Sequence, residues 1–268
     1  MGSSKNEINL NLKIKSMKKT LIALCCIGML SACKNENKKD AQHGAAKITD
    51  SKNTKAEEES PWISLFNGES ADGWRAYNGK EGESLPSGWV IENGTLKSLG
   101  KGGDLGGDII YSKEKFDEFE LELQWKLSEG GNSGIFYHVV EDSTQESPYW
   151  AAPEYQIIDQ IGFPQKLEPW QSIGADYGMY NPNYSKEDLK PIGQWNTSKI
   201  RFTTDKVTYW LNGKETVSFV PWSEDWEERK ASGKWKDYPD YGSTKTGYIG
   251  LQDHGSPIWF KEIRIKKL

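Results

Sequence analysis

Polar side chains that could carry out acid and base chemistry lie on one face of several predicted strands. In the C-terminal part of the chain, Ile249 and Leu251 fall on one face by the two-residue period of a strand, so Gln252 and His254 fall on the other. The same alternation in three other predicted strands adds further members to this face. The added residues are Gln124, Lys126, Phe136, His138, Glu154 and Gln156.

These residues together supply a carboxylate, two imidazoles, several amides, an ammonium group and an aromatic ring. This is the inventory of a polar ligand site with acid and base capacity. Each residue also has a plainer explanation, because a single histidine on a strand is more often structural, and Glu154 or Lys126 alone would be an ordinary solvated charge. The functional interpretation depends on several strands that direct polar groups to the same side.

Two aspartates near these strands are assigned to the substrate-binding set together with Gln252. Asp159 lies five residues after Glu154 and faces the core side of an unbroken strand, unless a bulge or the strand end turns it. Asp253 is opposite in phase to His254, so it could instead brace a loop or orient a neighbour.

Conventional glycoside hydrolysis usually requires two carboxylates that flank the scissile bond. Laminarinase-type sandwiches supply them from alternate positions of one strand. In this chain the alternate partner of Glu154 is Gln156. The usual pair is therefore missing from this strand, although a loop could supply a second acid.

The elements that position these residues are predicted to be strands joined by tight turns. Asn93-Gly94 and Asn212-Gly213 each separate two apolar stretches, and Asn-Gly is the strongest short hairpin signal because both central residues of a type I′ turn need positive φ. Further strands are predicted at 119–127, 135–140, 154–159, 199–203, 247–252 and 258–265. Many strands and few helical patterns predict an all-β antiparallel sandwich.

Two long segments, 162–196 and 221–246, interrupt the strand pattern. The second contains one short helix, predicted from Ser223 as N-cap, acidic residues in the first turn and basic residues in the last turn. Loops of this length in a compact domain are usually functional, so we expect both to wall a concave face.

The first 60 residues differ from the rest, because they contain no Trp, Tyr or Phe. A basic start at Met17, a short apolar run and the sequence Leu30-Ser31-Ala32-Cys33 resemble a bacterial lipoprotein signal. We therefore predict an upstream extension and signal peptide at 1–33, lipidation at Cys33, a flexible tether at 34–60 and one domain at 61–268. The alternative is a buried N-terminal helix. The expected location is the cell envelope, at the outer membrane, with the lipid bilayer as a partner.

Composition excludes several classes of function. The chain carries 34 Lys and Arg against 39 Asp and Glu, and the two signs are interspersed, so no basic stripe for nucleic acid is present. All three cysteines precede residue 34, which leaves the predicted domain without a disulfide or a cysteine-ligated metal.

Five motifs in order along the chain carry a family resemblance. They are Gly-Asn-Ser-Gly-Ile-Phe-Tyr-His at 131–138, Pro-Glu-Tyr-Gln-Ile-Ile-Asp at 153–159, Lys-Pro-Ile-Gly-Gln-Trp-Asn at 190–196, Trp-Leu-Asn-Gly at 210–213 and Gly-Leu-Gln-Asp-His-Gly at 250–255. From about Trp62 to its end, the chain resembles the bacterial 3-keto-disaccharide hydrolase family, formerly described as a domain of unknown function. The resemblance implies a concanavalin A-like jelly roll, secreted or lipid-anchored, that acts on sugars oxidised to a ketone at carbon 3.

The implied reaction needs one strong base and a group that stabilises an enolate. The ketone acidifies the hydrogen on carbon 2, so a base can remove it, the group on carbon 1 can leave, and water can add. Glu154 or His254 would be the base and the other the acid, while His138, Gln156 and Lys126 would hold the ketone oxygen. Phe136 and a nearby tryptophan would stack on the sugar.

Cofactor use and two other functions remain open at this stage. A divalent ion held by histidine and carboxylate could polarise the ketone, but no ligand spacing in the sequence demands one. The alternatives to a 3-keto-glycoside-cleaving enzyme are a non-catalytic carbohydrate-binding module and a conventional two-carboxylate glycosidase.

Overall fold

The computed structural model describes residues 61–102 and 107–268. Its strands are β1 (Ile63–Ser64), β2 (Trp74–Ala76), β3 (Trp89–Glu92), β4 (Thr95–Leu99), β5 (Ile109–Phe116), β6 (Phe119–Leu127), β7 (Asn132–Val139), β8 (Glu154–Ile158), β9 (Asn196–Phe202), β10 (Val207–Leu211), β11 (Lys214–Phe219), β12 (Gly247–Leu251) and β13 (Pro257–Lys267). One α-helix, α1 (Glu224–Ser232), and four short 3-10 helices, η1 (Pro148–Trp150), η2 (Pro169–Gln171), η3 (Lys186–Asp188) and η4 (Lys234–Asp237), complete the described elements.

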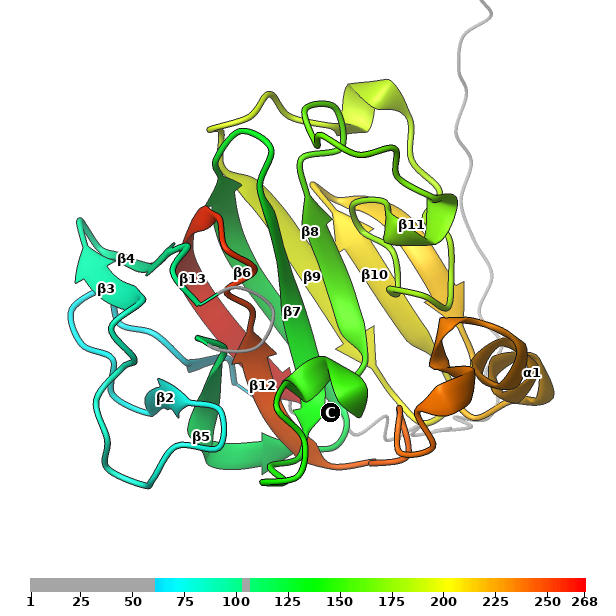
Figure 1. Ribbon diagram of the computed structural model, residues 1–268, viewed down its shortest axis with the longest axis horizontal. Helices are drawn as coiled ribbons and strands as arrows, with labels where there is room; N and C mark the ends of the chain where they lie inside the picture. The colour runs from blue at the N-terminus through cyan, green and yellow to red at the C-terminus, as the bar shows by residue number, and fades with distance from the viewer. Residues whose placement is uncertain (1–60, 103–106) are drawn as a thin grey trace, which may run out of the picture. The chain divides into compact units, whose positions relative to one another are not determined.

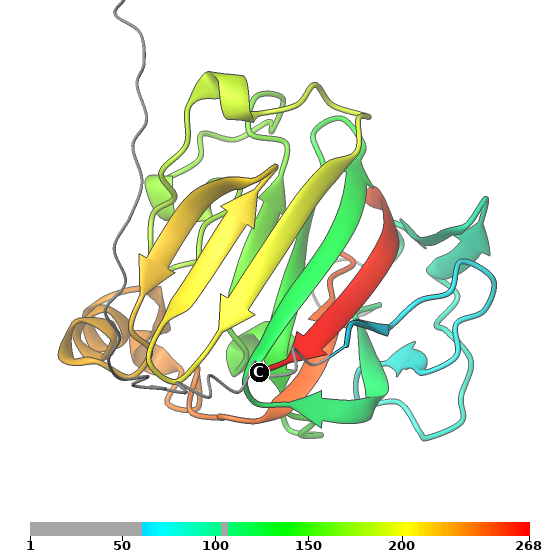
Figure 2. The ribbon, with the colours of Figure 1, turned by 180° about the vertical axis from the view of Figure 1, so that it is seen from behind.

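The strands form two antiparallel sheets packed face to face. The larger sheet has the order β11-β10-β9-β6-β13-β4-β3, with β1 paired to β13, and the smaller sheet has the order β2-β5-β12-β7-β8. The smaller sheet faces the viewer in Figure 1, and the larger sheet faces the viewer in Figure 2. The predicted all-β jelly-roll sandwich with one short helix is confirmed.

Both predicted Asn-Gly hairpins are present. Asn93 and Gly94 join β3 to β4 with φ values of 50° and 73°, and Asn212 and Gly213 join β10 to β11 with φ values of 52° and 85°. Helix α1 also begins as predicted, because the hydroxyl of Ser223 accepts a hydrogen bond from the backbone N–H of Trp226 at 3.3 Å.

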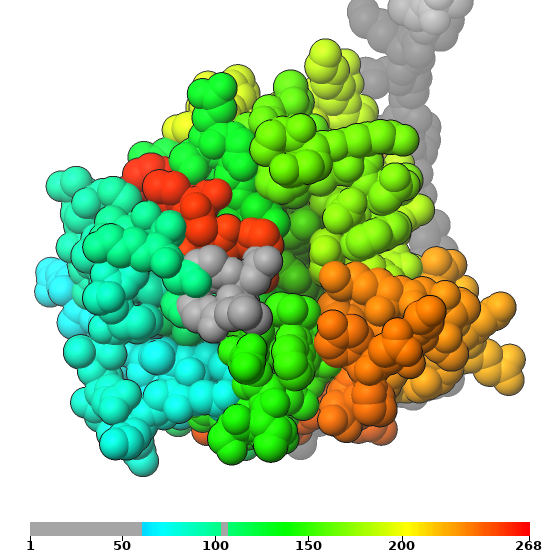
Figure 3. All heavy atoms as spheres, in the orientation of Figure 1, coloured from blue at the N-terminus to red at the C-terminus, as the bar shows by residue number. Residues whose placement is uncertain are grey.

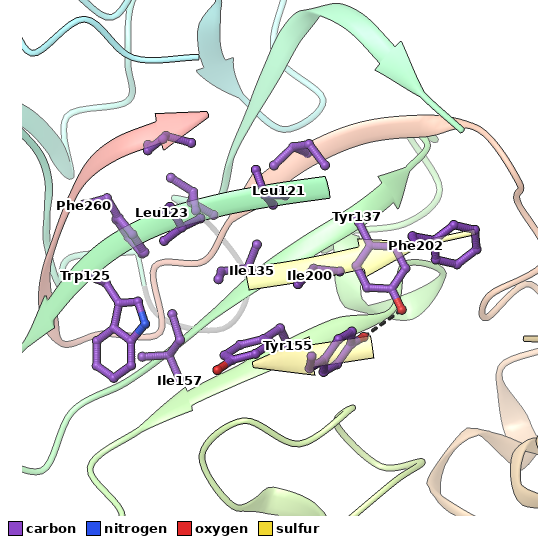
Figure 4. Close-up of a cluster of buried hydrophobic side chains, with 14 of the residues drawn as sticks. Leu121, Leu123, Trp125, Ile135, Tyr137, Tyr155, Ile157, Ile200, Phe202 and Phe260 are labelled. Atoms are coloured by element: carbon purple, nitrogen blue, oxygen red, sulfur yellow. Dashed lines mark hydrogen bonds between the residues drawn. The ribbon is translucent and has the colours of Figure 1, made fainter. Parts of the chain in front are cut away.

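The core lies between the two sheets. Strand β6 alternates buried and half-buried residues along its whole length, which places one row of apolar side chains toward the smaller sheet. Figure 4 shows labelled side chains of β6, β7, β8 and β9 gathered in this buried cluster. The hydroxyl groups of Tyr137 and Tyr209 meet across the layer at 2.7 Å, so a polar contact also links the sheets.

The predicted signal peptide, tether and lipidated Cys33 lie outside the described residues. Within the described part of the chain, no helix has the length and apolar content needed to span a membrane.

Candidate active site

A pocket of about 100 Å³ lies on the outer face of the smaller sheet. Its floor comes from β7, β8 and the end of β12, and its walls come from the long loops. The lining residues are Asn132, Tyr149, Glu154, Gln156, Tyr177, Lys234, Gln252 and His254. The pocket therefore brings together four of the residues predicted from sequence, namely Glu154, Gln156, Gln252 and His254.

Strand β8 presents Glu154 to the pocket while the alternate residue Tyr155 points into the core. The segment around Ala175 extends the sheet beside β8, because the backbone N–H of Tyr177 donates to the carbonyl of Glu154 at 3.0 Å. Glu154 is only 3% exposed, so its carboxyl group lies on the pocket floor, away from bulk water.

Gly134 of β7 makes room for the Glu154 carboxyl group. A Cβ atom at this position would lie 2.1 Å from Glu154 Oε1, which is far inside van der Waals contact. The carboxyl group can therefore occupy this position only because residue 134 has no side chain.

We expect Gly134→Ala to fold normally and to lose about 100-fold in kcat, because a displacement of about 1 Å in a reacting group can cost that much. The clash falls on a side chain and not on backbone, so the melting temperature should change little. Steady-state kinetics and thermal unfolding measure the two effects. Full activity in the folded variant would contradict the role given to this carboxyl position.

Three amide residues of the pocket lining each carry a buried side-chain oxygen atom without a hydrogen-bond partner among the described residues. The oxygens are Asn132 Oδ1, Gln156 Oε1 and Gln252 Oε1. The amide nitrogen of Gln156 is held by the carbonyl of Gln171 at 3.2 Å. Because a buried acceptor without a donor is costly, these oxygens are suited to accept hydrogen bonds from a ligand that carries hydroxyl groups.

His254 and Asp253 follow β12 and have different surroundings. His254 is half-buried and lines the pocket. Asp253 is fully buried and braces the neighbouring loops, because its carboxylate accepts hydrogen bonds from the backbone N–H groups of Gly102 at 2.9 Å and Gly255 at 3.1 Å. The structure thus places Asp253 as a support for the His254 loop, outside the pocket lining.

His138 does not share the face of Glu154, so its predicted position is wrong. Its ring lies between the sheets, 4.4 Å from Phe202 and 5.9 Å from Phe119, and its Nε2 is 2.9 Å from the carbonyl oxygen of Asp117. The reason is a β-bulge in β7: two residues separate Phe136 from Val139, while one separates their partners in β12. The extra residue has a φ of 55° and reverses the alternation.

Burial lowers the pKa of His138 to about 4. A histidine whose pKa is depressed in the folded state contributes stability above its ordinary pKa of 6.5, and this stability is lost as the pH falls through 6.5 toward 4. We expect a fall of about 3 kcal/mol in the free energy of unfolding from this residue between pH 7 and pH 4. Urea unfolding across this range measures it.

The matched comparison for this effect is His138→Leu, which removes the titrating group and keeps an apolar side chain. Its loss of stability on acidification should be smaller than that of the natural protein by about the same amount. Identical pH dependence in the two proteins would contradict the assignment. An NMR titration in which the His138 ring gains its proton near pH 6.5 would also contradict the lowered pKa assigned to His138.

Lys126 and Phe136 also lie away from the pocket, contrary to their predicted positions. Lys126 belongs to the larger sheet and points outward, with Nζ 4.5 Å from the ring centroid of Trp259. Gln124 of the same strand donates to Glu262 on that outer face at 2.6 Å. Phe136 is fully buried against Ile110 and its neighbours, so its ring cannot stack on a sugar.

Asp159 directly follows β8 and holds a loop. Its carboxylate accepts hydrogen bonds from the backbone N–H groups of Gly130 and Gly162, both at 2.8 Å. It lies at a second cleft of about 450 Å³, mostly apolar, which also includes Ile161 and Ile192. The carboxylate oxygens are thus already used by the backbone, and the smaller pocket remains the stronger candidate for catalysis.

Asn132, Tyr149, Tyr177 and Lys234 line the pocket but were not identified as site residues from the sequence. Asn132 begins β7 and Tyr149 belongs to η1, whereas Tyr177 and Lys234 come from the long segments 162–196 and 221–246. The prediction that these segments wall the site is consistent with this placement. Figure 3 shows the orange atoms of the second segment beside green atoms of the segment near residue 150, and the rings of Tyr149 and Trp235 lie 6.4 Å apart.

No group of three or more His, Cys, Asp or Glu side chains in the described residues is arranged to hold a metal ion. The pocket itself contains one carboxylate and one imidazole among its described lining residues. Its chemical capacity is therefore proton transfer, combined with hydrogen-bond acceptance by amides.

Comparisons with known proteins agree with this architecture. The chain is 31% identical to the 3-keto-disaccharide hydrolase of Bacteroides thetaiotaomicron, in an alignment that covers 94% of this chain and all of that protein. A crystal structure of a candidate glycosyl hydrolase from Parabacteroides distasonis is 37% identical, with a TM-score of 0.71, and the match covers 77% of this chain and 94% of that one.

A second candidate glycosyl hydrolase from the same organism is 25% identical, with a TM-score of 0.58, over 78% of this chain and all of that one. The model of the 3-keto-alpha-glucoside-1,2-lyase-like domain family matches residues 61–266. This match covers nearly the whole of the predicted domain and includes every residue that lines the pocket. The chain therefore belongs to the 3-keto-alpha-glucoside-1,2-lyase-like family.

Proposed function

We propose that the protein cleaves glycosides, and specifically 3-keto-glycosides, by elimination followed by addition of water. Membership of the family and the similarity to a 3-keto-disaccharide hydrolase support glycoside cleavage. The observation that carries the finer proposal is the pocket lining, which combines one buried carboxylate with one imidazole and three amide oxygens that lack partners. A direct displacement would usually require a second carboxylate beside the bond.

The reaction begins when the Glu154 carboxylate removes the proton from carbon 2. The electrons of the broken C–H bond form an enolate with the ketone at carbon 3. The enolate then expels the oxygen on carbon 1, and His254 gives this oxygen a proton. Water adds across the resulting enone, with its oxygen at carbon 1 and a proton at carbon 2, which yields the free 3-keto sugar.

We assign the base role to Glu154 because it lies on the pocket floor and is 3% exposed. His254 is half-buried and comes from a loop at the end of β12, where a leaving group could depart toward solvent. The amide oxygens of Asn132, Gln156 and Gln252 would accept hydrogen bonds from sugar hydroxyl groups and orient carbon 2 over the carboxylate.

Matched native and 3-keto-disaccharides test this proposal with the purified protein. We expect cleavage of the 3-keto substrate only, and slower cleavage when its carbon 2 carries deuterium. Rapid cleavage of the native disaccharide without an isotope effect would refute the elimination and favour direct displacement. Tight binding of either sugar without cleavage would instead indicate a carbohydrate-binding module.

We also propose that the protein is anchored in the cell envelope through a lipid on Cys33. The support is the apolar run followed by Leu30-Ser31-Ala32-Cys33, together with the polar segment that follows it. Cys33→Ala should move the protein from the membrane fraction to the soluble fraction of expressing cells. Cys26→Ala is the control, and it should leave the distribution unchanged; equal distributions of the two variants would contradict lipidation at Cys33.

A further inference from the structure

Lys234 is the only lysine or arginine among the described residues that line the Glu154 pocket. It begins η4, directly after the segment that contains α1. Its Nζ lies 3.3 Å from the phenolic oxygen of Tyr177, to which it donates a hydrogen bond. The side chain is exposed at the pocket rim, so a bound sugar ring would cover its ammonium group.

Aromatic side chains hold this ammonium group in place. Nζ lies 4.6 Å from the ring centroid of Tyr177, and the centroids of Trp235, Tyr149 and Trp170 lie between 5.1 and 5.9 Å away. The faces of aromatic rings attract a cation at these distances.

The backbone that carries Lys234 is fixed by the next residue. Trp235 is fully buried, and its indole N–H donates to the carbonyl oxygen of Tyr177 at 3.0 Å. Its ring stacks on Tyr241, with centroids 4.0 Å apart and planes inclined by 9°. Two hydrogen bonds therefore connect this segment to Tyr177: one from the side chain of Lys234 to the Tyr177 hydroxyl group, and one from Trp235 to the Tyr177 carbonyl oxygen. Together they position the Lys234 ammonium group at one wall of the pocket.

The proposed reaction would be accelerated by such a cation. When the proton leaves carbon 2, negative charge develops on the oxygen of carbon 3, and a fixed positive group beside that oxygen lowers the barrier. The ammonium group of Lys234 lies in the pocket lining and carries both a positive charge and hydrogen-bond donors. The pocket volume of about 100 Å³ is well below the roughly 300–1,000 Å³ of sites that enclose a drug-sized ligand, so one sugar ring would contact most of its lining.

We infer that the Lys234 ammonium group donates a hydrogen bond to the ketone oxygen at carbon 3 and stabilises the enolate formed there. The inference rests on the proposed function. In this step the C–H bond at carbon 2 breaks, Glu154 receives the proton, and the electron pair forms the carbon–carbon double bond of the enolate. Lys234 keeps its three protons and forms no covalent bond with the substrate. Its hydrogen bond stabilises the negative oxygen until the electrons of the enolate expel the group on carbon 1.

Lys234→Met, Lys234→Arg and the control Lys236→Met test this role. Lys236 lies in the same 3-10 helix and is also exposed, but it does not line the pocket. On a 3-keto-disaccharide, Lys234→Met should lose about 10²–10³-fold in kcat, as expected when one oxyanion donor is removed, with a smaller change in KM. Lys234→Arg should recover part of this loss because it restores a cationic donor, and Lys236→Met should match the natural protein.

A second measurement separates this role from a structural one. Removing the enolate stabiliser makes proton removal harder, so the isotope effect of deuterium at carbon 2 should rise in Lys234→Met. A folded Lys234→Met variant with natural kcat, or a borohydride-stable adduct on Lys234, would overturn the inference while leaving the proposed function intact. If the natural protein cleaves only the native disaccharide, the proposed function fails, and the role of Lys234 at a ketone fails with it.

Discussion

Replacement of Glu154 with glutamine should lower kcat on a 3-keto-disaccharide by about 10²–10⁴-fold, the range expected for loss of a general base. Glutamine has nearly the same shape but cannot accept a proton at neutral pH. The side chain is 3% exposed, and glutamine has nearly the same volume, so the variant should fold without opening a cavity. Steady-state kinetics and thermal unfolding on the same preparation provide the measurement.

The partner residue supplies the control for this prediction. His254→Asn should cause a comparable loss, and the double variant Glu154→Gln/His254→Asn should be little worse than either single variant, because groups that act in one reaction are not additive. Additive losses would mean that the two residues act independently. A folded Glu154→Gln variant that keeps more than a tenth of the natural kcat would remove Glu154 from the role of base.

The largest effect on stability is expected for Phe260→Ala, at about 3–5 kcal/mol. Phe260 of β13 is fully buried between the sheets, and its ring lies 6.1 Å from that of Trp89. Truncation removes its contacts and leaves a cavity that the rigid sandwich cannot close. In a domain of this size the melting temperature should fall by roughly 6–20 °C.

The next residue in the strand, Trp259, is the matched control. It points to the opposite face of the larger sheet, where Nζ of Lys97 lies 4.8 Å from its ring centroid and Nζ of Lys126 lies 4.5 Å away. Trp259→Ala removes a larger ring than Phe260→Ala, yet it should cost only about 1 kcal/mol, since partly exposed cation–π contacts are weak. Equal losses in the two variants would contradict the layer assignment of β13.

Much of the fold could be predicted because its signals are local. The alternation of residues 119–127 corresponds to β6 along its full length, and the Asn-Gly pairs correspond to turns at 93–94 and 212–213. A strand that is buried on one face shows this in its own sequence. The capped helix at 224–232 is equally local, since the cap is three residues from its hydrogen-bond partner.

The errors in the candidate site arise from two non-local properties. His138 was misplaced because alternation presumes an unbroken strand, and the extra residue in β7 becomes visible only when β7 is aligned with β12. Lys126 was misplaced because alternation gives the face of a strand but not the sheet to which the strand belongs. Glu154 and Gln156 were placed correctly because β8 is short and regular.

Apart from Asn132, which begins β7, the pocket residues missed from the sequence come from segments without a period. Tyr177 and Lys234 reach the pocket through backbone hydrogen bonds and ring stacking, and neither contact leaves a repeating pattern. Length alone indicated that these loops were functional. Which of their many aromatic and basic residues face Glu154 depends on tertiary packing, as the buried neighbour Trp235 illustrates.

The space left by Gly134 has a consequence for interpreting related sequences. Because a Cβ atom there would lie 2.1 Å from the Glu154 carboxyl oxygen, a relative with a larger residue at this place cannot keep a glutamate in the same rotamer. Its carboxyl group must turn elsewhere, and its ligand preference must change as well. The glycine and the glutamate are therefore best treated as one linked character when relatives are sorted into those that share this chemistry and those that have lost or altered it.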